Sequence, residues 1–174
     1  MLRGELVGLR ARLEADVPIL EDELHGDVVG TTRSSGRPWW PMSPGAEASR
    51  YRITEPSDTE ARFSVVELAT DTLAGAAVLT DIDTYGRSAS IGLMVRPAFR
   101  GKGFGTDIVR VLCDYAFTVL GLHRVAMDTL ADNHAMISAA RKAGFTQEGV
   151  LREAAWMLGE FLDLVEFSRL AEDT

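Results

Sequence analysis

The amino-acid sequence predicts a single mixed α/β domain, and three observations support this prediction. The chain has 174 residues, 46% of them hydrophobic, which is enough for one core and too few for two. Strand-like runs at residues 62–70, 73–82 and 89–95 are separated by short polar turns. Apolar residues then recur every three or four positions from Ile108 to Val119, which indicates a helix. We therefore expect residues 1–174 to form one domain.

Two elements and an irregular segment precede these strands. Residues 5–14 begin with the alternation of a strand, and residues 15–27 continue as a short helix in which Asp16 suits the cap. Residues 28–49 show little periodicity and contain several prolines, which is typical of a functional or disordered segment. Trp39 and Trp40 lie in this segment. Their indoles could line a substrate pocket or contact a partner, and packing of one of them into the core is an equally good interpretation.

The rest of the chain continues the mixed pattern. The three strand-like runs are close enough in sequence to form an antiparallel meander. After the glycine-rich stretch at 100–106 we expect a helix about four turns long, whose apolar stripe runs from Ile108 to Val119. A strand over 123–130 should follow, then a helix that Asp132 or Asn133 caps and Gly144 closes, and a final pair of strands over 145–157 and 160–170.

Composition excludes several classes of function. Eighteen basic against 26 acidic residues give a net charge of −8, which argues against a nucleic-acid partner. The negative field favours a cationic substrate or protein partner, although mildly acidic proteins without such a partner are common. No run approaches the roughly 20 apolar residues of a membrane span, and the N-terminus lacks the apolar region of a signal peptide. We expect a cytoplasmic protein that does not bind membranes.

The single cysteine and the three histidines predict neither a disulfide nor a metal site. Cys113 lies within the apolar stripe of the predicted helix, so we expect a buried small hydrophobe rather than a nucleophile. The three histidines show no ligand spacing and no neighbouring cluster of Cys or carboxylate residues.

The stretch RGKGFGTD, residues 100–107, predicts an anion-binding loop. Three glycines alternate immediately before the predicted helix, where backbone N–H groups lack intrahelical partners and the helix dipole is positive. Arg100 and Lys102 add positive charge, so we interpret the loop as a phosphate cradle, with a plain tight turn as the alternative. Lys102 is not followed by Ser or Thr as in a P-loop, and Thr106 stands where a dinucleotide-binding fingerprint requires glycine.

Together with the downstream sequence, this loop resembles the GNAT superfamily of acyl-CoA-dependent N-acetyltransferases. The similar features are RGKGFG as Arg/Gln-x-x-Gly-x-Gly/Ala, Asn133 eleven residues before Gly144-Phe145, and the C-terminal pattern EGVLRE…G…D…F. Within the superfamily the chain resembles the branch that includes the ribosomal-protein N-terminal acetyltransferases, over nearly its whole length. The resemblance implies a central, mostly antiparallel twisted sheet of six to seven strands, splayed in the middle and flanked by about four helices.

The resemblance also implies acetyl-CoA as the cosubstrate, with no metal. The edge of the strand at Leu93, Met94 and Val95 would hold the amide-bearing pantetheine arm, which can mimic a β-strand. Asn133 would contribute a hydrogen bond near the thioester, and helix capping is its alternative role. The diphosphate of coenzyme A would be held by Arg100, Gly101, Lys102, Gly103, Phe104, Gly105 and Thr106.

Three residues that relatives use in catalysis are replaced in this chain. Ser90 stands where many relatives carry a Glu, Ala140 where many carry a Tyr, and Met136 where the ribosomal branch often has a Ser. Ser90 itself, Glu67 and Ser138 are the alternative catalytic candidates, each also suited to an ordinary surface or packing role. We expect the backbone N–H of Val95 or a neighbour to stabilise the oxyanion of the tetrahedral intermediate.

We therefore expect an acetyltransferase that acts on a primary amine, either a protein N-terminus or a small molecule, in a ternary complex with acetyl-CoA. Two alternatives remain: a non-catalytic acyl-CoA-binding module, motivated by the three replacements, and an acyltransferase that uses succinyl-CoA or another longer donor. We expect a monomer or a homodimer. We also expect Gly103→Val to abolish cofactor binding in a protein that remains folded.

Overall fold

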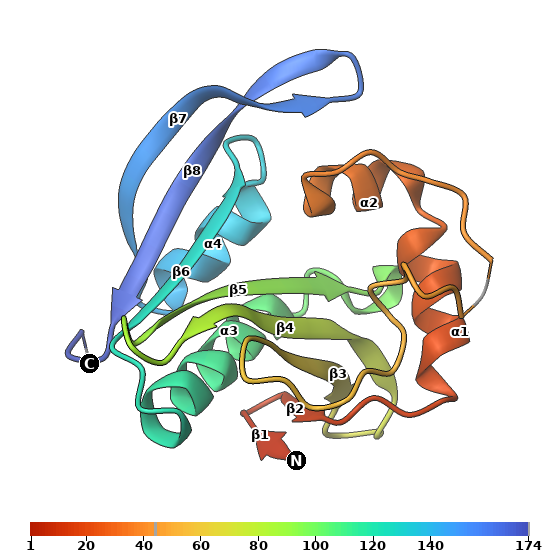
Figure 1. Ribbon diagram of the computed structural model, residues 1–174, viewed down its shortest axis with the longest axis horizontal. Helices are drawn as coiled ribbons and strands as arrows, with labels where there is room; N and C mark the ends of the chain where they lie inside the picture. Colours follow the sequence, from red (N-terminus) through yellow and green to blue (C-terminus); the bar gives the residue numbers. More distant parts are fainter. Residues whose placement is uncertain (44, 174) are drawn as a thin grey trace.

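Residues 1–43 and 45–173 are described in a computed structural model, and their backbone forms an eight-stranded sheet with helices on both faces (Figure 1). The strands follow the order β1-β2-β3-β4-β5-β6-β8-β7 and pair antiparallel, except for the parallel pair of β5 and β6. The strands are β1 (Leu2–Arg3), β2 (Val7–Arg10), β3 (Ala61–Glu67), β4 (Leu73–Asp83), β5 (Ser88–Val95), β6 (Arg124–Leu130), β7 (Thr146–Met157) and β8 (Glu160–Leu170).

Four α-helices and three shorter helical segments connect these strands. The helices are α1 (Asp16–Leu20), α2 (Val28–Ser35), α3 (Phe104–Asp114) and α4 (His134–Lys142). The π-helical segments η1 (Glu21–His25) and η3 (Tyr115–Val119) extend α1 and α3, and the 3₁₀ turn η2 (Pro97–Phe99) leads from β5 toward α3. None of the helices in the described ranges is both long enough and apolar enough to cross a lipid bilayer.

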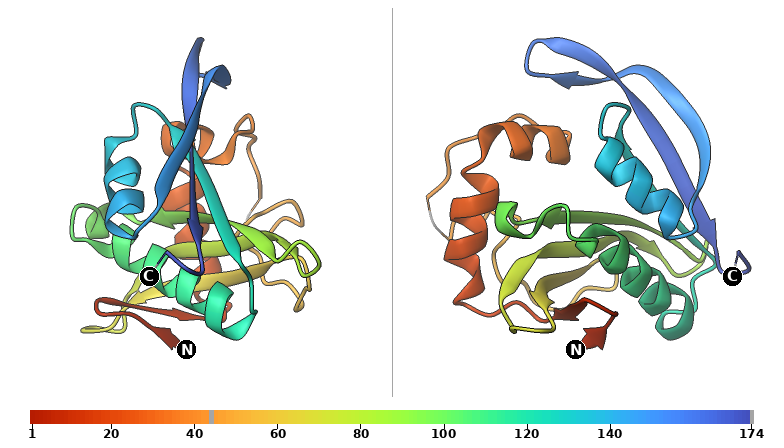
Figure 2. Two further views of the ribbon diagram at one scale, coloured as in Figure 1. Left: turned by 90° about the vertical axis from the view of Figure 1, so that its left-hand side faces the viewer. Right: turned by 180° about the vertical axis from the view of Figure 1, so that it is seen from behind.

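Two of the three apolar cores in the described ranges lie on opposite faces of the sheet, and the third lies at the β7–β8 hairpin. The larger core packs α3 and α4 against the face that carries Val65, Ile91 and Val125. The smaller core packs Leu20 and Leu24 of α1 and η1 against the other face. In Figure 1 α3 lies behind β4 and β5, and in the reverse view of Figure 2 it lies in front of them. We call the face covered by α1 and η1 the α1 face.

The β7–β8 hairpin extends beyond the rest of the molecule (Figures 1 and 2). It turns at Leu158 and Gly159, both with positive φ, as the sequence predicts for this pair. Trp156 and Phe161 pack edge to face near its tip, with ring centroids 4.8 Å apart.

Most elements predicted from the sequence are present, with three differences. The strand count is eight rather than six to seven, because the two-residue β1 adds a strand to the edge. Residues 28–35 form helix α2, although their sequence lacks helical periodicity. Asp16 does not cap a helix from outside. It is buried at the first position of α1, where it pairs with Arg10 and accepts a hydrogen bond from Ser64.

Candidate active site

The candidate active site lies where the sheet divides between β5 and β6. The two strands pair only at residues 88–90 and 124–126, and among the described residues no pairing continues from there to Val95 and Leu130. Figure 1 shows the strands diverging beyond this short contact. The N–H of Arg96 bonds to the carbonyl of Ala74 on the β4 side, at 2.9 Å. Because N–H directions alternate along a strand, the N–H and C=O of Val95 face the gap.

The loop before α3 presents a row of free main-chain donors beside this gap. Within the described part of the chain, no N–H from Gly101 to Thr106 has a hydrogen-bond acceptor. Gly103 is the N-cap residue of α3, and no side chain caps the helix there. Gly101 and Gly103 have φ values of +74° and +83°, where other residues are strained. A Cβ at Gly101 would meet no atom within 4 Å, and one at Gly103 would approach only Leu6, at 3.5 Å. The loop therefore has both the donors and the open space that an anion requires.

Gly105 differs from the other two glycines in its surroundings. It lies within α3, and a Cβ there would lie 3.8 Å from the Cβ of Ala139 on α4. This glycine lies where α3 passes close to α4.

A hollow of about 330 Å³ adjoins the loop, and its lining contains two basic and two acidic residues. Arg110 lies one to two helical turns into α3, and its guanidinium donates to the carbonyl of Lys142 at the end of α4, at 3.0 Å. The residues lining the hollow are Glu5, Leu6, Gly103, Thr106, Asp107, Arg110 and Lys142.

Buried Asp107 fixes the first turn of α3 against the N-terminal strands. Its carboxylate accepts hydrogen bonds from the N–H groups of Glu5, Leu6 and Val7 at 3.1, 2.8 and 2.9 Å. The carboxylate is thus satisfied by backbone donors from a distant part of the chain. It orients α3, and with it the loop, relative to the sheet.

The end of β5 is fixed by two arginines. Arg96 pairs with Glu23 of η1, donates to the carbonyl of Leu73, and places its guanidinium 5.5 Å from the centroid of the Phe99 ring. Arg96 lowers the pKa of Glu23 through this hydrogen-bonded pair. Arg100, predicted to hold the diphosphate, also donates through Nε to the carbonyl of Val95 at 3.0 Å.

The four predicted catalytic residues do not converge on one point. Val95 lies at the open end of β5, whereas Ser90 lies in the paired part of the strand, opposite Ala126. Glu67 lies at the β3–β4 turn, where it accepts a hydrogen bond from Thr70 at 2.6 Å. Ser138 is exposed on α4. Of these four, only Val95 has main-chain groups facing the divergent part of the gap.

Asn133 caps α4 in the structure. Its side-chain oxygen accepts from the N–H of Met136 at 3.2 Å, and its amide nitrogen donates to the hydroxyl of Thr129 at 3.0 Å. Both functional ends of the side chain thus have protein partners, as expected of a cap. A contact with acetyl-CoA remains a prediction.

Sequence reasoning missed a polar cluster on the α1 face of β5, beside Val95. The hydroxyls of Tyr51 and Ser34 donate to the sulfur of Met94 at 2.9 and 3.3 Å, and Arg50 Nη1 lies 4.0 Å from the same atom. Burial raises the pKa of Tyr51 to about 12, so its hydroxyl keeps its proton at neutral pH. These residues come from α2 and the segment after it, where no periodicity or motif pointed to the site.

Cys113 has no role at the gap. It is fully buried in the larger core, as predicted, and burial raises the pKa of its thiol to about 12. Across the described ranges, no group of three or more His, Cys, Asp or Glu side chains is arranged to hold a metal ion.

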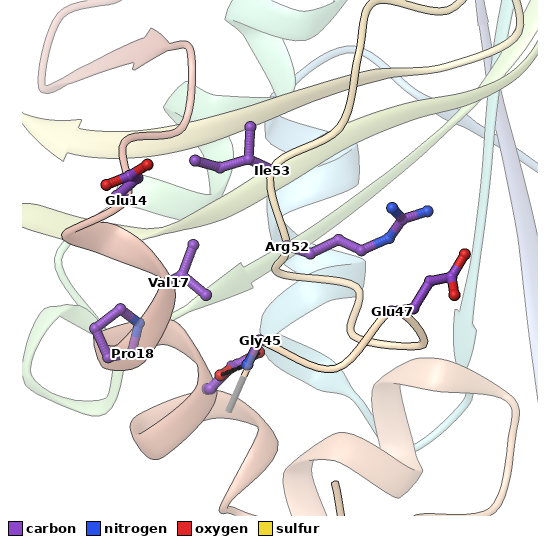
Figure 3. A pocket seen from close by; sticks show the side chains of 8 residues that line it. Glu14, Val17, Pro18, Gly45, Glu47, Arg52 and Ile53 are labelled. Atoms are coloured by element: carbon purple, nitrogen blue, oxygen red, sulfur yellow. Dashed lines mark hydrogen bonds between the residues drawn. The ribbon is translucent and has the colours of Figure 1, made fainter. Parts of the chain in front are cut away.

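A second hollow, of about 620 Å³, lies between α1 and residues 45–53 (Figure 3). None of its lining residues comes from β5, β6 or the loop at 100–106, so it is separate from the candidate site. Its lining residues are Glu14, Val17, Pro18, Glu21, Gly45, Glu47, Arg52 and Ile53.

Trp39 and Trp40, whose role the sequence does not decide, lie beside η1. The indole N–H of Trp39 donates to the carbonyl of His25 at 2.9 Å, and its ring stacks on the imidazole. The side chain of Trp40 is exposed.

Comparison with known proteins agrees with this arrangement. Residues 7–146 match the sequence profile of the acetyltransferase (GNAT) domain. The spermidine N(1)-acetyltransferase of Vibrio cholerae is 33% identical over 107 residues, which are 62% of this chain and 61% of that protein. YdaF of Bacillus subtilis, provisionally named a ribosomal N-acetyltransferase, is 35% identical over 101 residues, 58% of this chain and 55% of that protein.

A solved structure shows the same fold over nearly the whole chain. The spermidine N-acetyltransferase of Vibrio cholerae, in complex with CoA and spermine, aligns with a TM-score of 0.78 at 22% identity, covering 97% of each chain. The relatives thus include both polyamine and ribosomal acetyltransferases by name, so they do not single out the ribosomal branch. The profile match covers most of the chain, including the gap and the loop, and the protein belongs to the acetyltransferase (GNAT) domain family.

Proposed function

We propose that this protein transfers an acetyl group from acetyl-CoA to the primary amine of a small cationic acceptor. The observation that carries the proposal is the row of N–H groups from Gly101 to Thr106 that have no acceptor among the described residues, beside a strand edge that has no partner among them. A diphosphate and an extended chain of amides are the two chemical groups that these features would bind together. Coenzyme A contains both.

The loop and the strand edge divide the binding of acetyl-CoA between them. The N–H groups of residues 101–106 would hold the diphosphate, and the gap-facing groups of Leu93 and Val95 would pair with the pantetheine arm. The adjoining hollow is lined by basic Arg110 and Lys142 and by acidic Glu5 and Asp107, so its charges balance and we assign no phosphate to it.

The chemistry requires an amine to attack the thioester carbonyl, followed by loss of the thiolate. The N–H of Val95 faces the gap and would stabilise the oxyanion that forms on attack. Holding the amine and the thioester together supplies a further part of the rate enhancement.

Charge on the open part of the α1 face supports a cationic acceptor. Asp128 on β6 lies directly opposite Glu166 on β8, and both side chains are exposed. Their neighbours Met127 and Phe167 belong to the larger core, so by strand alternation the two carboxylates point to the α1 face. Two like charges at opposite positions of a sheet are unfavourable without a counter-ion. Arg124 on β6 provides part of this counter-charge to Glu166 while it pairs with Glu148, and a cationic amine would add to it, in keeping with the net charge of −8.

A protein N-terminus is the second candidate acceptor, and the observation that favours it is the position of Glu67 away from the gap. That carboxylate lies at the β3–β4 turn rather than in the gap, so it is poorly placed as a general base. An α-amine, with a pKa of about 8, is partly neutral near pH 7, whereas an alkyl amine near 10.4 is not. A site without a strong base therefore favours an α-amine.

An acceptor screen tests the proposal. Purified protein with acetyl-CoA would be assayed for thiol release on polyamines, on monoamines and on peptides with free or blocked N-termini. We expect turnover on polyamines. Turnover on free N-termini alone would support the second candidate, and tight acetyl-CoA binding without turnover would indicate a non-catalytic acyl-CoA-binding module. Competition with succinyl-CoA tests the preference for the acyl group.

A further inference from the structure

Helix α2 is attached to the rest of the molecule with little apolar packing. Of its eight residues only Thr31 is buried, and Val28 and Val29 are both exposed. The helix lies between Gly26 and Gly36, and Gly36 ends it in the left-handed conformation. Such a segment is held mainly by its polar contacts.

Three polar contacts join α2 to both sides of the gap. At its N-terminus, Asp27 lies 3.8 Å from Arg100 of the loop before α3. Near its C-terminus, the hydroxyl of Ser34 donates to Met94 of β5, at 3.3 Å. Arg33 reaches the opposite side and pairs with Asp132, in the turn between β6 and α4, at 2.5 Å. Figure 1 shows α2 and this turn facing each other across the gap, beyond β5.

The Arg33–Asp132 pair is well placed to be exchanged. The Arg33 side chain is 32% exposed and that of Asp132 50%. Exposed ion pairs contribute little to stability, because each charge remains well solvated. A cation arriving from solvent can therefore replace the guanidinium at small cost. The turn that carries Asp132 borders the open end of the gap, where the gap-facing N–H of Val95 also lies.

We propose that Asp132 selects acceptors with a second cationic group, which replaces Arg33 on its carboxylate while the reacting amine lies near Val95. This inference rests on the proposed function and narrows its substrate class to diamines and longer polyamines. Arg33 then competes with the acceptor, so the two residues have opposite effects on the use of diamines.

The experiment compares diamines of four, six and eight carbons with monoamines of equal length. Their kcat/KM would be measured at saturating acetyl-CoA for the wild type, Asp132→Asn, Arg33→Gln and the double variant. Asp114→Asn is the matched control, because Asp114 is exposed at the far end of α3 and its loss changes the net charge equally.

We expect Asp132→Asn to lower kcat/KM for the preferred diamine about fivefold, as for loss of one exposed ion pair, and to leave the monoamine unchanged. Arg33→Gln should raise the diamine value, and Asp114→Asn should not alter the diamine-to-monoamine ratio. Equal losses for diamine and monoamine in Asp132→Asn, or a selective diamine loss in Arg33→Gln, would overturn the inference.

Calorimetry of diamine binding to the CoA-loaded protein repeats this comparison without turnover. Selective binding that depends on Asp132, with no acetylation of any amine, would overturn the proposed function and leave the role of Asp132 intact. Turnover without dependence on Asp132 would overturn the inference alone.

Discussion

Arg100 Nε donates a hydrogen bond of 3.0 Å to the carbonyl oxygen of Val95. This bond joins the loop with the free N–H groups to the peptide that faces the open end of the gap. The same guanidinium lies 3.8 Å from Asp27, at the start of α2. The Arg100 side chain thus connects its loop both to the end of β5 and to the start of α2.

Substitution of Arg100 should therefore affect both binding and turnover. We expect Arg100→Ala to raise the KM for acetyl-CoA and to lower kcat, each several-fold, because the Val95 peptide loses its support. Lys102→Ala is the matched control, since Lys102 carries the same charge but lies over the Phe99 ring at 5.2 Å. It should alter KM alone. Equal effects of the two variants on kcat would show that only loop charge matters.

Substitution of the loop glycines tests the phosphate cradle directly. We expect Gly101→Ala and Gly103→Ala to weaken acetyl-CoA binding at least tenfold in calorimetry, since each places a methyl group in the open space of the loop. The positive φ adds a strain of roughly 1–2 kcal/mol, which a typical stability of about 5–15 kcal/mol tolerates. Gly103→Val strains the backbone more than alanine does, so the stability of this variant must be measured together with its acetyl-CoA binding. Gly105→Ala is the control within the same motif, and a tenfold loss there would contradict this division of roles.

Removal of the Asp107 carboxylate should destabilise the fold. Asp107→Ala leaves three N–H groups at residues 5–7 without their acceptor, which we expect to cost about 3 kcal/mol in urea unfolding. Asp114→Ala, on the exposed face of the same helix, should change stability by less than about 0.5 kcal/mol. A comparable loss in both variants would indicate an effect of helix charge instead.

The Tyr51 hydroxyl should matter for turnover more than for folding. Tyr51→Phe keeps the buried ring and removes the group that donates to the Met94 sulfur, a weak acceptor, so we expect about 1 kcal/mol of destabilisation. We expect kcat to fall about tenfold, with the KM for acetyl-CoA unchanged, as for loss of one proton-transfer or hydrogen-bonding group. Tyr115→Phe, in η3, is the control. If both variants retain full kcat, the hydroxyl has no part in the reaction.

Acid should weaken the pairing of β7 with its neighbours through Glu148. Hydrogen bonds from Arg124 and Ser168 lower the pKa of Glu148 to about 2. Because the folded-state pKa lies below the unfolded value near 4.3, its contribution to stability is present above that value and is lost as pH falls toward 2. Glu148→Gln should therefore lower the melting temperature at pH 7, and the difference from wild type should shrink on acidification. A constant difference from pH 7 to pH 3 would contradict the assignment.

The sequence predicted most of the fold because its strongest patterns are local. The meander of β3, β4 and β5, the helix that carries Ile108 and Leu112, and the hairpin around Leu158-Gly159 all follow from periodicity and turn residues, although α3 begins at Phe104, inside the predicted loop. The resemblance supplied what local patterns do not, namely the splayed sheet.

What the sequence did not predict depends on contacts between distant residues. Helix α2 lacks an apolar stripe, and its contacts with Met94, Arg100 and Asp132 join residues far apart in the sequence, so no local pattern predicts it. Tyr51 lies beside Met94 only because residues 45–53 return to the α1 face of the sheet. The pairing of Asp107 with residues 5–7 likewise spans about a hundred positions.

The short contact between β5 and β6 has a consequence for how the protein responds to its cosubstrate. In the described part of the chain, just three residue pairs between β5 and β6 link the strands of the first half of the sheet to those of the second. A molecule bound between β5 and β6 would connect the two halves of the sheet, so that they unfold together. It would also protect the amide protons of Leu93 and Val95 from exchange with solvent. Deuterium uptake at these two positions, with and without acetyl-CoA, would report how far the sheet depends on what it holds.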